Sequence, residues 1–151
     1  MRVPERLQIR GRPTLTDFQD DERFFREYAL ADLDEHGMLS PGAVWAPDFS
    51  VNWSRFSRPS DVFLRPNSSP EAGCYSFSVL DARADGLGYP VHEPVEEGDY
   101  ENYAHVEIRA AYQDANAGCV PPKRRKLGAE NKLRYRLMLR EAAVFEIAAS
   151  S

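Results

Sequence analysis

Side chains able to do acid–base chemistry alternate along a segment near the middle of the chain. Residues 103–110 alternate between apolar and polar types, which is typical of a half-buried β-strand. The polar positions carry a phenol, an imidazole, a carboxylate and a guanidinium: Tyr103, His105, Glu107 and Arg109. Alternate side chains of a strand share one face, at a spacing of about 7 Å. The sequence therefore predicts a row of groups that can exchange protons or bind an anion.

A second histidine is expected beside this row. His92 ends another short predicted strand, and a hairpin between the two strands would bring it next to His105. Two imidazoles can cleave a phosphodiester without a metal, one as the base and one as the acid, while a cation stabilises the phosphorane. One alternative is therefore a small nuclease or nucleotide-group transferase that uses His105 with Glu107, Arg109 and His92. In another arrangement, His92, His105 and Glu107 would supply three ligands to a divalent metal.

The same row has a purely structural interpretation. An antiparallel sheet commonly exposes one face to water, and Tyr, His, Glu and Arg are ordinary residues there. The sequence holds no nucleophile elbow, phosphate-binding glycine loop or metal-binding helix motif. It therefore leaves open whether the protein is an enzyme, and it implies no cofactor and no metal.

Positive charge is concentrated in residues 121–140. This segment has eight basic residues and one acid, a net +7 that leaves −12 for the rest of a chain whose total is −5. The basic residues are Lys123, Arg124, Arg125, Lys126, Lys132, Arg134, Arg136 and Arg140. They can contact nucleic-acid phosphates, contact a protein partner, or pair with the acidic stretches 17–35 and 93–101. Because the acidic remainder repels a polyanion, the sequence favours a protein partner over nucleic acid.

Helices and strands must position these residues. Thr16 and Gln19 form a capping-box pattern before apolar residues at helical spacing, so we expect a helix over 17–35 that ends at Gly37. We expect strands over 49–53, 74–80 and 103–110, and a helix over 129–148. The predicted fold class is α+β, a small antiparallel or mixed sheet with an N-terminal and a C-terminal helix packed against it.

The same patterns predict the domain organisation and the core. We expect an extended arm over 1–13, a single globular domain over 14–151, and an acidic loop over 93–101. The strands should bury Tyr75, Phe77, Val79, Val106 and Ile108. The C-terminal helix should bury Leu133, Leu137, Met138, Phe145 and Ile147.

Composition is that of an ordinary globular domain. The chain has 151 residues, of which 42% are hydrophobic and 28% are charged. No apolar run approaches the roughly 20 residues that span a bilayer, and no secretory leader pattern is present. Cys74 and Cys119 belong to no ligand motif, so we expect reduced thiols. These features predict a soluble cytoplasmic protein with no membrane contact.

Three short motifs follow one another over about residues 35–110. Residues 37–41 read G-M-L-S-P, residues 50–51 read S-V, and residues 102–108 read N-Y-A-H-V-E-I. This order resembles a group of small bacterial proteins of unassigned function with the motifs G-x-L-x-P, S-V and N-P-A-H-x-x-I, although Tyr103 replaces the proline. The resemblance implies a bacterial origin and draws attention to His105, but it implies no activity.

The leading expectation is a non-catalytic function. We expect a cytoplasmic binding or accessory protein that acts through a protein or nucleic-acid contact including residues 121–140. The small enzyme built around His105 is the alternative.

Overall fold

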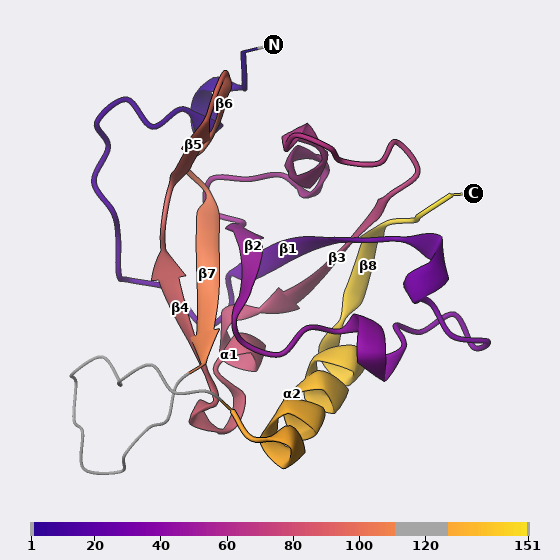
Figure 1. Ribbon diagram of the computed structural model, residues 1–151. Helices are drawn as coiled ribbons and strands as arrows, with labels where there is room; N and C mark the ends of the chain where they lie inside the picture. The colour runs from indigo at the N-terminus through magenta and orange to yellow at the C-terminus, as the bar shows by residue number, and fades with distance from the viewer. Residues whose placement is uncertain (1, 111–126, 151) are drawn as a thin grey trace, which may run out of the picture.

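The computed structural model describes residues 2–110 and 127–150, which form a six-stranded antiparallel sheet and a separate two-stranded hairpin. The sheet order is β4-β7-β2-β1-β3-β8 (Figure 1). Its strands are β1 (Arg23–Tyr28), β2 (Phe49–Trp53), β3 (Gly73–Ser78), β4 (Gly88–His92), β7 (His105–Ala110) and β8 (Val144–Ile147). The hairpin pairs β5 (Val95–Glu97) with β6 (Tyr100–Asn102). The α-helices are α1 (Val79–Ala82) and α2 (Ala129–Ala142). Short 3-10 helices are η1 (Glu5–Leu7), η2 (Leu30–Asp32), η3 (Pro41–Ala43), η4 (Pro59–Leu64) and η5 (Ala84–Gly86).

The predicted α+β class and the central strands are confirmed. The segment 49–53 coincides with β2, and the segment 103–110 contains β7. β3 occupies most of 74–80 before the chain enters α1, where the Ser78 hydroxyl accepts a hydrogen bond from the Asp81 N–H at 3.0 Å. The core residues predicted on these strands are all buried: Tyr75, Phe77, Val79, Val106 and Ile108.

The N-terminal helix predicted over 17–35 is wrong. Its middle forms β1, which pairs antiparallel with both β2 and β3. Phe24 and Phe25 are both buried although they are adjacent, because they contact opposite faces of the sheet. A strand that is covered on both faces buries consecutive residues, which hides the alternation expected of a strand. Gln19 donates its N–H to Glu22 Oε1 at 2.8 Å instead of closing a capping box.

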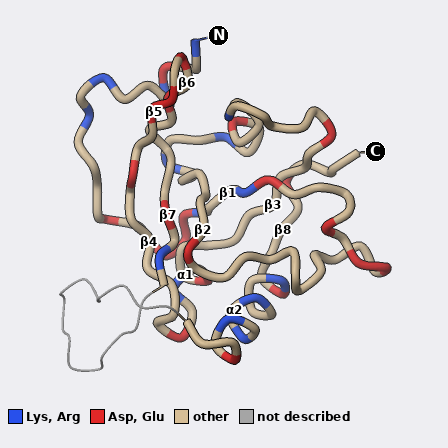
Figure 2. Tube along the Cα trace, viewed as in Figure 1, with Lys and Arg blue, Asp and Glu red and all other residues tan. Residues whose placement is uncertain are grey.

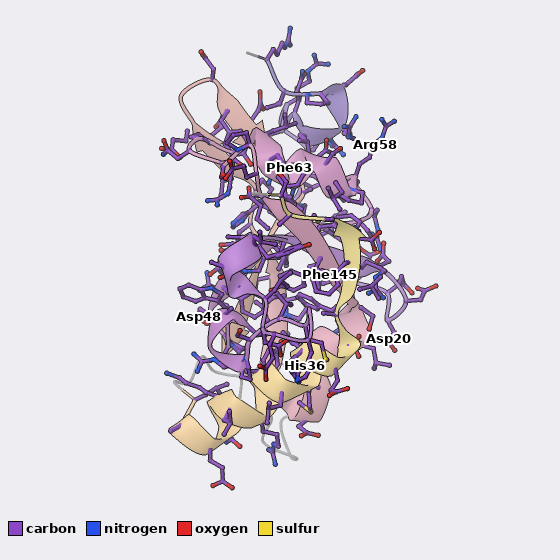
Figure 3. The ribbon with its side chains drawn as sticks, turned by 90° about the vertical axis from the view of Figure 1, so that its right-hand side faces the viewer. Asp20, His36, Asp48, Arg58, Phe63 and Phe145 are labelled. Atoms are coloured by element: carbon purple, nitrogen blue, oxygen red, sulfur yellow. The ribbon has the colours of Figure 1, made fainter. Side chains whose placement is uncertain are left out.

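The C-terminal helix is shorter than predicted. α2 ends at Ala142, and the rest of the predicted helix forms β8, which pairs with β3. The sequence V-F-E-I of this strand is rich in β-branched and aromatic residues, which favour extended backbone. Figure 3 shows Phe145 on β8, between α2 and the 3-10 helix that carries Phe63. Phe145 is 42% exposed, since β8 is an edge strand of the sheet.

The face that α2 buries also differs from the prediction. Tyr135 and Leu139 enter the core, and the Tyr135 hydroxyl donates to the Ala82 carbonyl at 2.6 Å. The predicted inward residues Leu133 and Leu137 are 51% and 42% exposed. Tyr135 and Leu139 are four residues apart, and so are Leu133 and Leu137. Because this is the spacing of one helical face, α2 carries two apolar stripes, which lie on nearly opposite sides of the helix. The sheet buries only one of them.

The N-terminal residues pack against the domain. Val3 and Leu7 are buried with Ala104, and η1 occupies part of the segment predicted to be extended. Arg6 forms an ion pair with the buried Asp61 at 2.5 Å. These contacts tie the start of the chain to η4 and to the residues before β7.

The acidic stretch 93–101, predicted as a loop, contains β5 and the start of β6. Gly98 takes a positive φ of 60° at the turn between these strands, a conformation that favours glycine. The hairpin stands at one end of the sheet, beside the N-terminal segment (Figure 1).

The sheet is covered differently on its two faces. One face forms the main core beneath α1 and α2, while η4 covers part of the other, which we call the outer face (Figure 1). Phe25, Val62 and Cys74 form a smaller apolar cluster on the outer face. Cys74 is a free thiol whose pKa is raised to about 12 by burial, whereas Cys119 lies outside the described residues. Within the described ranges, no helix is long and apolar enough to cross a membrane.

Candidate functional site

Three of the predicted site residues share the outer face of β7. His105, Glu107 and Arg109 are half-buried there, while the residues between them fill the core. Tyr103 precedes the strand and is 2% exposed, and its hydroxyl donates a hydrogen bond to the Pro13 carbonyl. The row predicted from the sequence therefore consists of an imidazole, a carboxylate and a guanidinium, without the phenol.

His92 does not join this row. The pairing of β4 with β7 puts His92 opposite Val106, on the core face. Its Nδ1 accepts the Leu15 N–H at 3.0 Å, and its Nε2 lies 2.5 Å from the Tyr103 carbonyl, to which it donates. Burial lowers the pKa of His92, which favours the neutral ring. Both nitrogens are bonded to main chain, so the paired histidines required by the two-imidazole mechanism are not formed.

His105 keeps one ring nitrogen available. Its Nδ1 lies 2.7 Å from the Glu93 carbonyl oxygen, and because a carbonyl only accepts, Nδ1 carries the proton in the neutral ring. Nε2 then presents a lone pair. Glu107 Oε2 lies 3.9 Å from Nε2, beyond hydrogen-bond distance, and accepts a hydrogen bond from the Ser50 hydroxyl at 2.9 Å. In this neutral form, His105 offers one hydrogen-bond acceptor on the outer face.

A pocket of about 160 Å³ opens beside His105 on the outer face, and we call it the outer-face pocket. It is lined by residues of β1, β2, η4, β6 and β7. Phe25 and Val62 supply apolar surface, and both are buried. Tyr100 and Asn102 supply polar groups from the hairpin. A cavity of about this size holds one small aromatic molecule.

Buried amides fix the polar wall of this pocket. The Asn102 amide donates to Asn52 Oδ1 at 2.7 Å, and the Asn52 amide donates to Ser57 Oγ at 3.2 Å. Asn102 Oδ1 accepts the Ala104 N–H at 3.0 Å. Burial raises the pKa of Tyr100, against a hydrogen bond from Asn102 that lowers it. The Tyr100 phenol therefore remains protonated at neutral pH and can donate.

The cations of Arg65 and Arg109 are already paired. Arg65 forms two hydrogen bonds with Glu27, at 2.8 and 3.2 Å, and this contact raises the pKa of Arg65. Arg109 forms an ion pair with Glu93, the residue whose carbonyl holds His105. An anionic ligand would have to break one of these pairs to gain either of these two guanidinium groups.

Half of the predicted basic surface lies outside the described residues, namely Lys123, Arg124, Arg125 and Lys126. On α2, Arg134 pairs with Asp85 at 3.3 Å and Arg140 pairs with Asp34 at 2.6 Å. The other basic residues of the helix, Lys132 and Arg136, are half-buried. Pairing with the acidic stretch 17–35, one of the alternatives from sequence, thus accounts for Arg140, whereas Asp85, the partner of Arg134, lies outside both acidic stretches.

A metal site is not formed in the part of the chain that the structure describes. No cluster of three His, Cys, Asp or Glu side chains is found there, so His92, His105 and Glu107 do not make the predicted ligand set. Comparison of the chain with protein-family models, with curated proteins and with solved structures finds no match. Its function is therefore inferred from the geometry of the site.

Sequence reasoning missed most of the outer-face pocket. Its polar lining residues besides His105 include Glu27, Arg65, Tyr100 and Asn102, which come from three separate parts of the sequence. Glu27 and Arg65 resemble surface charges, and Tyr100 lies in a stretch that reads as a loop. The N-Y-A-H motif was the available signal, because Asn102 and His105 both line the pocket.

Proposed function

We propose that this protein is a non-catalytic binding protein that holds one small, uncharged, nitrogen-containing aromatic base in the outer-face pocket. The observation that carries the proposal is that His105, whose Nδ1 is held by the Glu93 carbonyl, lines a pocket sized for one small aromatic molecule. The main-chain contact to Glu93 fixes the ring orientation before any ligand arrives, which lowers the entropic cost of binding.

The lining of the pocket defines the ligand chemistry. Phe25 and Val62 offer apolar contact to a flat ring. Nε2 of His105 accepts, so the ring must carry an N–H or amino group, and the Tyr100 hydroxyl donates, so the ring must also carry an acceptor. An amino-substituted nucleobase such as adenine or cytosine has both groups on one edge.

The ion pairs near the pocket support an uncharged ligand. The Arg65–Glu27 and Arg109–Glu93 pairs leave these guanidinium groups already satisfied. Breaking such a pair leaves a carboxylate without its partner, which is costly when the carboxylate is partly buried, as Glu27 is. Because these two cations are already paired, we expect an uncharged base to bind more tightly than a phosphate or a carboxylate.

The geometry favours binding over the nuclease alternative. Among the described residues, no hydroxyl, thiol or second imidazole is hydrogen-bonded to His105 Nε2. Nucleophilic catalysis needs a nucleophile in contact with its base, and acid–base cleavage of a phosphodiester needs a second proton-transfer group across the substrate. Glu107 is the neighbouring titratable group, but at 3.9 Å it leaves no room for a phosphate between the two.

Two features inferred from the sequence belong to the proposal. We place the protein in the cytoplasm, and we retain contact with a protein partner through residues 121–140 as a second activity. The exposed apolar stripe on α2 supports this second activity.

Calorimetric titration with free bases tests the proposed ligand class. Adenine and cytosine should bind with a dissociation constant on the order of 1 mM or tighter, as expected for about ten heavy atoms. Benzoate, which has the ring but is charged, and inorganic phosphate should bind more weakly than these bases. Stronger binding of either anion than of the bases would contradict the proposal.

Matched histidine variants locate the binding. His105→Ala should weaken adenine binding by about tenfold, the value of one hydrogen bond of about 1.4 kcal/mol. His36→Ala is the control, because His36 is exposed and lies outside the pocket. Equal affinity of both variants and the wild type would remove His105 from the site.

A further inference from the structure

The exposed side of α2 forms a groove with α1 and η5 that the proposed ligand site does not use. The groove has a volume of about 750 Å³, and its apolar surface comes mainly from Leu133, Leu137 and Met138. Leu133 and Leu137 are among the most exposed large apolar residues of the described chain. Exposed leucines at i, i+4 spacing typically mark a surface that receives another protein element.

The charge around this groove is acidic. Glu130 and Glu141 flank the leucines along α2, and Asp81 faces them from α1. These acids lie on α1 and near both ends of α2 (Figure 2). Arg134, the cation at the rim, is bonded to Asp85 and does not neutralise them. Within the described residues, no ion pair involves Asp81, Glu130 or Glu141.

The acidic rim argues against a second copy of the chain as the occupant. A two-fold dimer through this groove would bring the acids of one copy against those of the other. The chain also has a net charge of −5, which adds repulsion between copies. A partner with the opposite charge would gain from the same rim.

We propose that this groove binds an amphipathic helix of a partner protein, with apolar residues at i, i+3, i+4 and i+7 and basic residues beside them. The leucines of α2 would receive the apolar stripe of the partner. Glu130, Glu141 and Asp81 would face its lysine and arginine side chains. The partner is thus recognised by the face of α2 turned away from the core, and not by the basic residues of this helix.

Two synthetic helical peptides of about 18 residues test the proposal. One carries leucine at the apolar positions and lysine elsewhere, and the other carries glutamate in place of lysine. Fluorescence anisotropy should show that the leucine–lysine peptide binds at least about tenfold more tightly. Equal affinity for the two peptides, or tighter binding of the leucine–glutamate peptide, would overturn the proposal.

Matched variants separate the groove from general attraction to an acidic protein. Leu137→Asp should weaken binding of the leucine–lysine peptide by about tenfold or more, whereas Leu30→Asp, at another exposed leucine, should leave it unchanged. The double variant Glu130→Lys, Glu141→Lys should shift preference toward the leucine–glutamate peptide. The same exchange at Glu96 and Glu97 on the hairpin should not. If both exchanges act equally, the groove is not the site.

Light scattering addresses the rival occupant. The wild-type protein should remain monomeric at concentrations where the peptide binds. A dimer that Leu137→Asp dissociates would assign the groove to a second copy and overturn the partner-helix proposal. Thermal unfolding of each variant confirms that these exposed substitutions leave the fold intact.

Discussion

His92 and His105 lie on adjacent strands but point to opposite faces of the sheet. His92 is opposite Val106 in the pairing of β4 with β7, and Val106 and His105 are neighbours in the chain. Because side chains alternate along a strand, one histidine enters the core and the other faces the outer-face pocket. The two rings consequently have different functions: His92 joins segments of main chain, and His105 is available to a ligand.

Acid should destabilise the protein through His92. Burial and the nearby cationic or titratable groups Arg12, Arg55 and His105 hold the pKa of His92 below its usual 6.5. The unfolded chain then binds a proton that the folded chain does not, so the His92 contribution is complete above about pH 6.5 and is lost as pH falls through the folded pKa. Protonation of His92 also puts a proton on Nδ1, so that two donors, this N–H and the Leu15 N–H, then face each other.

Thermal unfolding from about pH 7.5 to about pH 5 measures this effect. His92→Asn should be less stable at the higher pH and should lose most of the pH dependence between these limits. His36→Asn, at an exposed histidine, should retain the wild-type dependence. A wild-type slope that survives in His92→Asn would contradict this role.

The ion pair between Arg6 and Asp61 should anchor the N-terminal segment. Asp61 is buried, and it accepts hydrogen bonds from Arg6 and from the Arg58 N–H. We expect Asp61→Ala to reduce the free energy of unfolding by about 2 kcal/mol, since it leaves these donors without their acceptor. Glu5→Ala is the control, because the pair of Glu5 with Arg10 is largely exposed and should contribute less than about 0.5 kcal/mol. Urea denaturation measures the free energy of unfolding of both variants. An equal decrease in Asp61→Ala and Glu5→Ala would show that burial of the Arg6–Asp61 pair is unimportant.

Gly88 should be intolerant of any side chain. A Cβ atom at Gly88 would lie 2.0 Å from the Ala82 carbonyl oxygen and 2.8 Å from the Tyr135 hydroxyl, which are hydrogen-bonded to each other. Gly88→Ala should therefore cost about 2–3 kcal/mol of stability. Gly42→Ala meets no atom within 4 Å and should be neutral or slightly stabilising. Similar melting temperatures for the two variants would argue against the close approach of β4 to α1 and α2.

The strands that sequence predicted well are those in which apolar and polar residues alternate. β2 and β7 alternate between apolar and polar residues because only one side of each packs into the main core. β1 escaped prediction because Phe24 and Phe25 are buried on opposite faces and acids precede them, as in the first turn of a helix. The orientation of α2 was ambiguous because Leu133–Leu137 and Tyr135–Leu139 have the same spacing.

The candidate site was predictable only in part. The alternation along β7 correctly put His105, Glu107 and Arg109 on one face. It could not reveal that His92 is opposite Val106, since that depends on the strand register. Nor could it reveal the pocket, which depends on how η4 and the β5–β6 hairpin approach the sheet.

Tyr100 should contribute a hydrogen bond to the bound ring. Tyr100→Phe keeps the aromatic surface but removes the donor, so adenine should bind about threefold to tenfold more weakly. Tyr89→Phe on β4 is the control, since Tyr89 does not line the pocket. Calorimetric titration of both variants measures the difference. Unchanged affinity of Tyr100→Phe would show that the ligand does not accept from this phenol.

The most direct test of ligand binding at His105 is to record the ring-nitrogen NMR signals of His92, on the core face, and of His105, on the outer face. In the free protein, His105 should be protonated at Nδ1 and His92 at Nε2, as their carbonyl contacts require. Addition of adenine should shift the unprotonated Nε2 of His105 as it accepts a hydrogen bond, and should leave both His92 nitrogens unchanged. An unchanged Nε2 signal under saturating adenine, or a proton on Nε2 in the free protein, would contradict the account.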